Sequence, residues 1–505
     1  MKGSTKKTLG IVLVALLVVA AAAAFIGVPW WEKRQEERAR AFLEGIGLRA
    51  EGVKASFFGN SLVFTKVSGD IPLDKIGLNY ALNLETVTAS GLDLLAGQRK
   101  GLTTLADSLV CSNALLTVTF LGEESTATIK EMAAKGIRLD LGSILEALKS
   151  PSPPREILSR LEDIFRLDHM VYTDYTVTMD APFGPVSIHI DKMEGRDVGV
   201  LNCGPMDMEN MTIRALGSEV YSLRHLGLSE MRVPNVLSLL AEKDDLGDFT
   251  PENFLKLLEK TPFVLEGLTF QDMKVQSPVG GEKISLGDLN LSLSFGTQAA
   301  GLDFALNDLS LPGPLLEDLV DILEEAGVEP GESFLFSGNL SSALKRDGGR
   351  TDLTFSAGAG EKSLGKVSLG GEFFLGEAGN ILEALLAEDY RVRSLAFSLT
   401  DTGSLQRFAE FQYRTGKEAG YLDESVKGPE DILRQLAEEA AADVDEDDAR
   451  AVPGLAPALK AFLQGSGTLS VTLRAEPPLS VEDLQFLDLG EMQKKGVTLG
   501  VEYKP

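Results

Sequence analysis

The stretch Thr261–Phe295, which reads TPFVLEGLTFQDMKVQ, then SPVGG, then EKISLGDLNLSLSF, decides the fold. Apolar and polar residues alternate in both outer segments, and the short linker between them contains proline and glycine. Successive side chains of a β-strand point to opposite faces, so this alternation predicts two strands that each have one apolar face. The linker predicts a turn between them, and the whole stretch therefore predicts an antiparallel β-hairpin.

The same layout recurs elsewhere in the chain. Val171–Lys192 places APFGP between VYTDYTVTMD and VSIHIDK, and Thr351–Leu375 alternates on both sides of GAGEKSLG. Shorter alternating segments occur at Ser61–Val67, Tyr80–Leu84 and Leu115–Leu121. Strands of this kind suit antiparallel sheets in which one face is covered.

A proline follows several of the extended segments. Ile71-Pro72, Val233-Pro234 and Leu311-Pro312 each precede text that is typical of a short amphipathic helix. Proline interrupts the ladder of a sheet and is tolerated in the first turn of a helix. The pattern predicts a degenerate repeat of long strands, a proline stop and a short helix, although chance recurrence remains an alternative explanation.

The last quarter of the chain has a different character. Its pattern predicts helices over Ser404–Ala442 and Ala456–Leu463, an acidic linker over Asp443–Asp448, and strands over Gly465–Ala475 and Val497–Tyr503. Glu476-Pro477-Pro478 is expected to end the first of these strands.

Together these patterns predict an α+β, β-dominated fold. Long antiparallel strands and hairpins are expected in repeated units, with short amphipathic helices and one N-terminal transmembrane helix. The expected division is 1–31 for a cytoplasmic tail and transmembrane anchor, 32–50 for a juxtamembrane helix, 51–150, 151–262 and 263–400 for three β-rich modules, and 401–505 for a helical segment with an acidic linker and closing strands.

The N-terminal apolar run, Leu9–Val28, indicates where the protein works. It contains no charge and is long enough, as a helix, to cross the hydrocarbon core of a bilayer. Trp30 and Trp31 follow it, as in the aromatic belt of a membrane interface. Small residues at Ala22–Ala24 also fit a cleaved signal peptide, but the length of the run and the charged helix after it favour a retained anchor.

The orientation of this anchor is inferred from its form. Basic residues lie on both sides of the apolar run and nearly balance, at Lys2, Lys6 and Lys7 before it and Lys33, Arg34, Arg38 and Arg40 after it. An N-terminal span of this form acts most simply as a signal-anchor, since large domains are translocated largely regardless of charge. We therefore expect a single-pass inner-membrane protein whose large domain is periplasmic.

Composition argues against several functions. The net charge is −27, which disfavours nucleic acid as a partner because its phosphates are bound by Lys and Arg. The chain has three histidines, His169, His189 and His225, and two cysteines, with no metal-ligand spacing among them, so we expect no metal and no cofactor. Cys111 and Cys203 could form one disulfide in an oxidising compartment, or could both be buried free thiols.

Two short motifs resemble binding loops and fail on inspection. Gly360–Lys366, GEKSLGK, has the spacing of a phosphate-binding loop, but valine follows it and strand-like text replaces the helix, so it is interpreted as a hairpin turn. Asp443, Asp445 and Asp447 alternate as in a calcium loop, yet the required Gly and Glu are missing. No catalytic residue is assigned, and the protein is expected not to be an enzyme.

The N-terminal span, the segment VKASFFGNSLVFTKVSGDIPLDKI after it and hairpin text such as LNDLSLPGPLLEDL resemble the AsmA-like group of membrane-anchored envelope proteins, which includes YdgA- and TamB-like relatives. The resemblance covers much of the chain as a style of sequence, without a sharp motif. It implies a periplasmic, β-rich protein that acts in outer-membrane biogenesis or lipid handling, with phospholipid or other envelope proteins as partners. The alternatives are a scaffold subunit of a secretion or surface-assembly complex and, third, a hydrolase of envelope polymers.

Overall fold

The computed structural model forms two compact units. The N-terminal unit comprises residues up to Ser218 together with Asn235–Phe249, and the C-terminal unit comprises Glu219–Pro234 and Thr250–Pro505. The structure describes residues 28–73, 78–120, 123–149, 160–181, 184–235, 257–276, 281, 283–325, 332–347, 350–377, 380–386, 389–423, 425–444, 449–450, 452–482 and 494–505.

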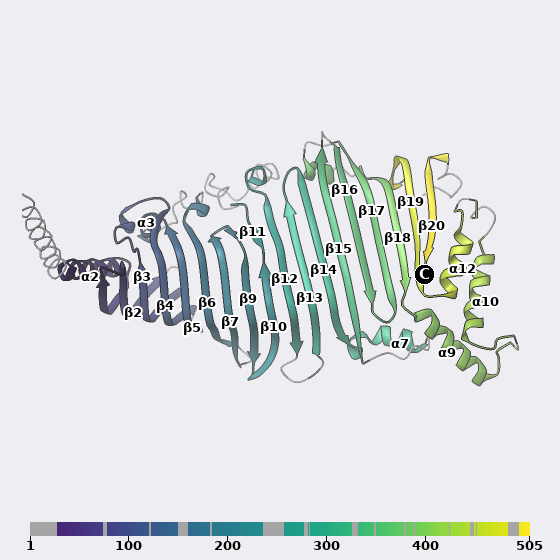
Figure 1. Cartoon of the computed structure of the whole chain (residues 1–505), viewed down its shortest axis with the longest axis horizontal. Helices are drawn as coiled ribbons and strands as arrows, with labels where there is room; N and C mark the ends of the chain where they lie inside the picture. Colours follow the sequence, from purple (N-terminus) through teal and green to yellow (C-terminus); the bar gives the residue numbers. More distant parts are fainter. Residues whose placement is uncertain are drawn as a thin grey trace, which may run out of the picture. The chain divides into compact units, whose positions relative to one another are not determined.

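The N-terminal unit is an antiparallel meander in which each long strand pairs with the next (Figure 1). Its strands are β1 (Arg49–Ser56), β2 (Ser61–Leu73), β3 (Leu78–Ser90), β4 (Thr103–Phe120), β5 (Glu123–Leu139), β6 (Phe165–Ala181), β7 (Gly184–Gly199), β8 (Asn202–Cys203) and β9 (Met206–Ala215). Its helices are α2 (Val28–Gly45), η3 (Ala96–Gln98), α3 (Leu141–Lys149) and η4 (Leu161–Asp163). β7 pairs with β9, and the two-residue strand β8 lies between them in sequence.

A line of irregular residues crosses this sheet at one level. We call it the seam, and it consists of residues that the pairing of neighbouring strands skips at this level: Glu51, Lys66, Glu85, Asn113, Lys130, Asp174, Asp191 and Asn210. Four of them have left-handed backbones, with φ of 50° at Lys66, 50° at Asn113, 49° at Asp174 and 53° at Asn210. Each pairing skips one residue on both strands, so the register between neighbouring strands is the same on either side of the seam.

The sequence changes phase where the seam crosses each strand. In β2, Leu62 and Phe64 precede the seam and Val67 follows it, and all three are buried in one cluster. An extra residue would otherwise turn every later side chain to the opposite face. The shift in alternation therefore keeps one apolar face continuous across the seam.

Helix α2 packs on the start of this apolar face. Its buried residues Ala39 and Leu43 contact a cluster from β1 to β4 that consists of Val53, Leu62, Phe64, Val67, Val87, Ala89 and Cys111. The helix also covers the open edge of β1, since Glu36 Oε1 accepts a hydrogen bond from the Ala55 N–H at 3.1 Å and Arg40 donates to the Ala50 carbonyl at 3.3 Å. Pairing of edge groups in this way blocks the addition of a foreign strand.

The strands of the C-terminal unit are also antiparallel, and they form an open sheet (Figure 1). Its strands are β10 (Ser218–Leu228), β11 (Glu230–Arg232), β12 (Phe263–Gln276), β13 (Lys283–Phe295), β14 (Ala299–Pro312), β15 (Ser333–Asp347), β16 (Arg350–Glu361), β17 (Gly365–Glu377), β18 (Arg391–Asp401), β19 (Gly467–Ser480) and β20 (Val497–Lys504). β10 and β11 both pair with β12, and from β12 to β20 each strand pairs with the next in sequence.

Helices of the C-terminal unit lie at the ends of its strands and beside the last of them. They are η6 (Gly313–Leu316), α7 (Glu317–Glu325), α8 (Ile381–Leu386), α9 (Ser404–Ala419), α10 (Pro429–Ala442) and α12 (Leu455–Gln464). Helix α9 starts where it does because the buried Asp401 carboxylate accepts hydrogen bonds from the backbone N–H groups of Gly403, Ser404 and Leu405 at 3.0, 2.8 and 3.2 Å. Side-chain oxygens at such positions satisfy the free N–H groups of a first helical turn.

The structure confirms a β-dominated, antiparallel fold and the three hairpins that alternation predicted, at β6–β7, β12–β13 and β16–β17. The GEKSLGK stretch is a hairpin turn, since Glu361 and Gly365 face each other across its end. The helix after Leu311-Pro312 is also confirmed, as η6 and α7.

One expectation about proline was wrong. β19 continues past Glu476-Pro477-Pro478 to Ser480, and a shift of register against β18 accommodates the two prolines. Pro72 pairs with Asn79 one residue before the end of β2. Prolines are tolerated near strand ends and at bulges, where a ladder hydrogen bond is already missing.

Candidate functional site

The most extensive feature of the C-terminal unit is one apolar sheet face. Residues directly opposite each other on paired strands share a face, so the register assigns the rows. We call three adjacent rows the central rows, and they cross the eight strands β13 to β20. They are Leu291, Phe304, Leu340, Ala357, Leu369, Phe397, Val471 and Val501; Leu293, Leu302, Ser342, Phe355, Gly371, Leu395, Leu473 and Leu499; and Leu289, Leu306, Gly338, Ala359, Val367, Leu399, Leu469 and Tyr503.

The central rows contain no charged residue. Only Ser342 and Tyr503 carry a hydroxyl, and the Tyr503 hydroxyl is engaged, since it donates to the Ser466 carbonyl at 3.1 Å. Neighbouring strands lie about 4.8 Å apart, so rows of this length extend over about 34 Å across the sheet. The face is therefore a broad apolar surface that offers a ligand almost no hydrogen bonds.

The middle of this face is open to solvent. Leu340, Leu369 and Phe397 lie in one row and are 37%, 43% and 43% exposed, and the neighbouring Val367 is 43% exposed. Buried residues of the sheet lie instead toward the ends of strands, where Phe334 packs against Leu323 of α7. Large exposed apolar patches are uncommon on soluble proteins and mark sites of interaction.

The opposite face of the same strands is polar. One of its rows reads Asn290, Ala305, Asn339, Gly358, Ser368, Ser398, Ser470 and Glu502. Hydroxyls pair across strands there, as between Ser368 and Ser398 at 2.5 Å and between Thr400 and Thr468 at 3.0 Å. The sheet is thus amphipathic, with one apolar and one polar face, as the alternation of its strands requires.

Three arginines line a cavity of about 370 Å³ beside the ends of β16 to β19. Arg350 is ion-paired with Asp352 at 2.8 Å, Arg391 with Asp389 at 3.0 Å, and Arg393 with Asp352 at 3.6 Å. Because each guanidinium already has a carboxylate partner, an anion would have to displace these pairs in order to bind.

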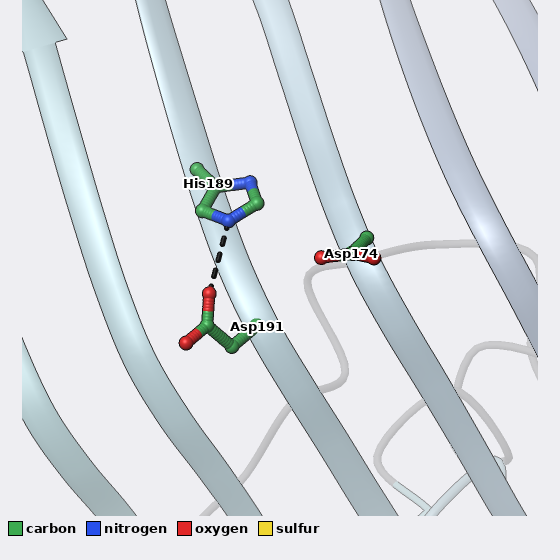
Figure 2. A group of neighbouring side chains, drawn as sticks. All are labelled: Asp174, His189 and Asp191. Atoms are coloured by element: carbon green, nitrogen blue, oxygen red, sulfur yellow. Dashed lines mark hydrogen bonds and ion pairs between the residues drawn. The ribbon is translucent and has the colours of Figure 1, made fainter.

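Asp174, His189 and Asp191 form the group that comes nearest to a metal site. Their ligand atoms lie within 4.8 Å of one another, and Figure 2 shows the imidazole and the Asp191 carboxylate in contact, with Asp174 on the adjacent strand. The atoms that would bind a metal already have hydrogen-bond or ion-pair partners. Asp174 pairs with Lys130 at 2.9 Å, and Asp191 pairs with Asn210 at 2.8 Å. His189 contacts Thr176 at 2.9 Å and Asp191 at 3.0 Å. The group belongs to the polar network of the seam.

The same polar face of the N-terminal unit holds His169, which lies in β6. Its Nε2 atom is 2.9 Å from Glu194 Oε1, and Lys192 Nζ lies 2.9 Å from the other oxygen of that carboxylate. The hydrogen bonds from His169 and Lys192 lower the pKa of Glu194 from 4.5 to about 2. This arrangement is an ion-pair network on a strand face.

The residues singled out from the sequence lie apart in the structure. Cys111 and Cys203 are both buried and are free thiols, and burial raises the pKa of the Cys111 thiol to about 11. Trp30 and Trp31 lie in the first turn of α2, and the Trp31 ring contacts Phe57 edge to face with centroids 5.2 Å apart. The apolar run Leu9–Val28 lies outside the described residues except for its last residue, as do most of the acidic residues of the calcium-like stretch, and no helix of the described part is long and apolar enough to cross a membrane.

Sequence analysis missed the central rows and the aromatic pair Phe57-Phe58. The rows depend on which strands pair and in what register, which alternation alone does not reveal. The two adjacent phenylalanines were visible in the segment VKASFFGNSLVFTKVSGDIPLDKI, where they precede Gly59 and Asn60.

Fold and site together define a class: a protein built of open, amphipathic antiparallel sheets. The chain matches no protein-family model and no curated protein.

Proposed function

We propose that this protein is a membrane-anchored envelope protein that holds the acyl chains of phospholipid on the apolar face of its C-terminal sheet. The observation that carries the proposal is the set of central rows, which are apolar, uncharged and exposed in their middle. The function is non-enzymatic binding and handling of lipid, in keeping with the resemblance to the AsmA-like group.

The chemistry of the face favours acyl chains over a protein partner. A protein surface usually brings polar groups that need partners at the interface, and the central rows offer two hydroxyls in all. An acyl chain has no hydrogen-bonding groups and binds by burying apolar area alone. The rows extend over about 34 Å, which exceeds the ~15 Å of hydrocarbon in one leaflet of a bilayer, so a whole acyl chain fits on the face.

The N-terminal apolar run supports a location beside a lipid source. As a retained single-pass anchor in the inner membrane, Leu9–Val28 keeps the large periplasmic part of the chain next to phospholipid. The acidic balance of the chain keeps that part soluble and does not favour broad adsorption to anionic head groups.

The test is the count of lipids that remain on the full chain after purification in detergent and delipidating washes, measured by native mass spectrometry and lipid extraction. The variant carries Leu340→Asp and Leu369→Asp, which place two carboxylates in one central row. The matched control carries Ser356→Asp and Ser368→Asp. These substitutions place the same two charges on the polar face of β16 and β17, next in sequence to the central-row residues Ala357 and Leu369.

We expect wild type and control to retain phospholipid, and the apolar-face variant to lose it by at least ~10-fold, because an unpaired charge against hydrocarbon costs several kcal/mol. Far-ultraviolet circular dichroism checks that all three fold alike. Equal retention in variant and control would contradict the proposal. A lipid-free chain that carries a stoichiometric protein partner would instead support the scaffold alternative.

A further inference from the structure

Four aromatic side chains gather at the N-terminal end of the described chain. Trp30 and Trp31 lie in the first turn of α2, and Phe57 and Phe58 lie in the turn between β1 and β2. Trp31 contacts Phe57 edge to face with centroids 5.2 Å apart, and Phe57 contacts Phe58 in the same way at 5.5 Å. We call these four residues the aromatic cluster.

The aromatic cluster is exposed. Phe58 is 84% exposed, Trp30 is 61% exposed and Phe57 is 46% exposed. Burial of a phenylalanine side chain stabilises a protein because a large apolar area leaves water. Phe57 and Phe58 forgo this stabilisation at the hairpin tip. Their exposure therefore points to a surface that they meet in the working protein.

The cluster is held in place by hydrogen bonds. Glu32 Oε1, one turn into α2, accepts from the Phe57 backbone N–H at 3.1 Å, and Glu36 Oε1 accepts from the Ala55 N–H at 3.1 Å. These contacts fix the hairpin tip beside the start of α2 and engage the carboxylates of Glu32 and Glu36. Arg34, whose guanidinium lies 5.2 Å from the centre of the Trp30 ring, adds a cation at the same place.

The position of the cluster in the chain identifies the surface. The helix that carries Trp30 and Trp31 begins at Val28, the last residue of the apolar run Leu9–Val28. Tryptophan is enriched where a span meets the head groups, and an arginine beside it suits the phosphates there. A bilayer interface is thus within direct reach of all four rings.

We propose that the β1–β2 turn is a second membrane contact, in which Phe57 and Phe58 enter the interface of the bilayer beside the anchor and fix the orientation of the N-terminal unit to the membrane. This inference rests on the anchoring role of Leu9–Val28, which is part of the proposed function, and not on the binding of lipid by the C-terminal sheet.

The chain offers its own probe, because Trp30 and Trp31 are its two tryptophans. The full chain is reconstituted into phosphatidylcholine vesicles whose acyl chains are brominated either near the carbonyl or near the methyl end. A thiol-reactive, environment-sensitive dye is attached in a Phe58→Cys variant. The matched control is Leu216→Cys, at the β9–β10 turn, where the native leucine is 54% exposed. Cys111 and Cys203 are buried and do not compete for the dye in the folded protein.

We expect the dye at position 58 to emit at shorter wavelength than the dye at 216, and to lose intensity when bromine lies near the carbonyl. Tryptophan emission should be quenched by the same lipid. Quenched tryptophan together with a dye at 58 that behaves like the dye at 216 would overturn the inference and leave the anchor intact. If neither tryptophan nor the dye at 58 is quenched, the anchor itself fails, whereas lipid retention on the C-terminal sheet is measured separately.

Discussion

Asn113 illustrates what the seam demands of one residue. It lies in β4 with φ of 50°, its side chain is exposed, and its amide donates to the Glu85 carboxylate on β3. Asparagine and glycine adopt this left-handed backbone readily, whereas a β-branched residue is strained there.

We therefore predict that Asn113→Val lowers the free energy of unfolding by about 1–2 kcal/mol and that Asn113→Gly changes it by less than about 0.5 kcal/mol. Urea unfolding followed by circular dichroism checks both variants. Equal losses in the two would show that the hydrogen bond to Glu85, and not the backbone, determines the choice of asparagine.

Glu194 carries the residue-level prediction on pH. Its hydrogen bonds to His169 and Lys192 lower its pKa from 4.5 to about 2, so the ionised form stabilises the folded state. That stabilisation is complete above pH 4.5 and is lost as the pH falls toward 2. We predict that Glu194→Gln lowers stability by about 1 kcal/mol at neutral pH, a modest value because the network is partly solvated.

The difference between wild type and Glu194→Gln should narrow once the pH falls below 4.5 and should vanish only below pH 2, where the carboxylate is protonated in the folded state as well. Denaturant titrations at neutral pH and at successively lower pH measure this difference. A difference in stability that stays constant over this pH range would mean that His169 and Lys192 do not lower the pKa of Glu194.

At the scale of the element, α2 contributes side chains to the core and also covers the free edge of β1. Leu43 is buried against residues of β1 to β4, whereas the adjacent Glu44 is exposed. We predict that Leu43→Ala lowers the free energy of unfolding of the N-terminal unit by about 3 kcal/mol, since a cavity is added to the lost apolar contact.

Thermal unfolding of the full chain reports this loss as a lower melting temperature for one transition. Glu44→Ala is the matched control on the same helix and should leave the transition within experimental error. A small effect of Leu43→Ala would mean that α2 is loosely attached, and the edge of β1 would then be open to other strands.

The elements themselves were largely predictable. Alternation located the hairpins at β6–β7, β12–β13 and β16–β17 because a side-chain period of two is a local property of the chain. Strand lengths were underestimated: Ser61–Val67 was expected, whereas β2 continues to Leu73, because the seam at Lys66 changes the phase of the pattern and hides its second half. The central rows could not be predicted, since they depend on the register between eight paired strands, which alternation within a single segment does not reveal.

At the scale of the whole molecule, charge and apolar surface are separated. The chain carries a net charge of −27, yet no charged residue lies in the central rows. We predict that the amount of phospholipid retained by the full chain is unchanged when purification is carried out in ~1 M salt, where the screening length is about 3 Å.

Lipid extraction after washes at low and high salt tests this prediction. Loss of lipid at high salt would indicate that head groups are held by charge, and the cavity lined by Arg350, Arg391 and Arg393 would be the first place to examine. The outcome thus distinguishes hydrocarbon from head group as the part of the lipid that is bound.

The order of the strands has a consequence for how the chain is made. Within each unit the long strands pair with their neighbours in sequence, and α2, which protects the first strand, is synthesised before that strand. A growing chain can therefore form its sheet progressively from the N-terminus, and each new strand finds its partner already in place. The exposed edge at any moment is the most recent strand, so the nascent protein never has to wait for its C-terminus in order to hide its first strand.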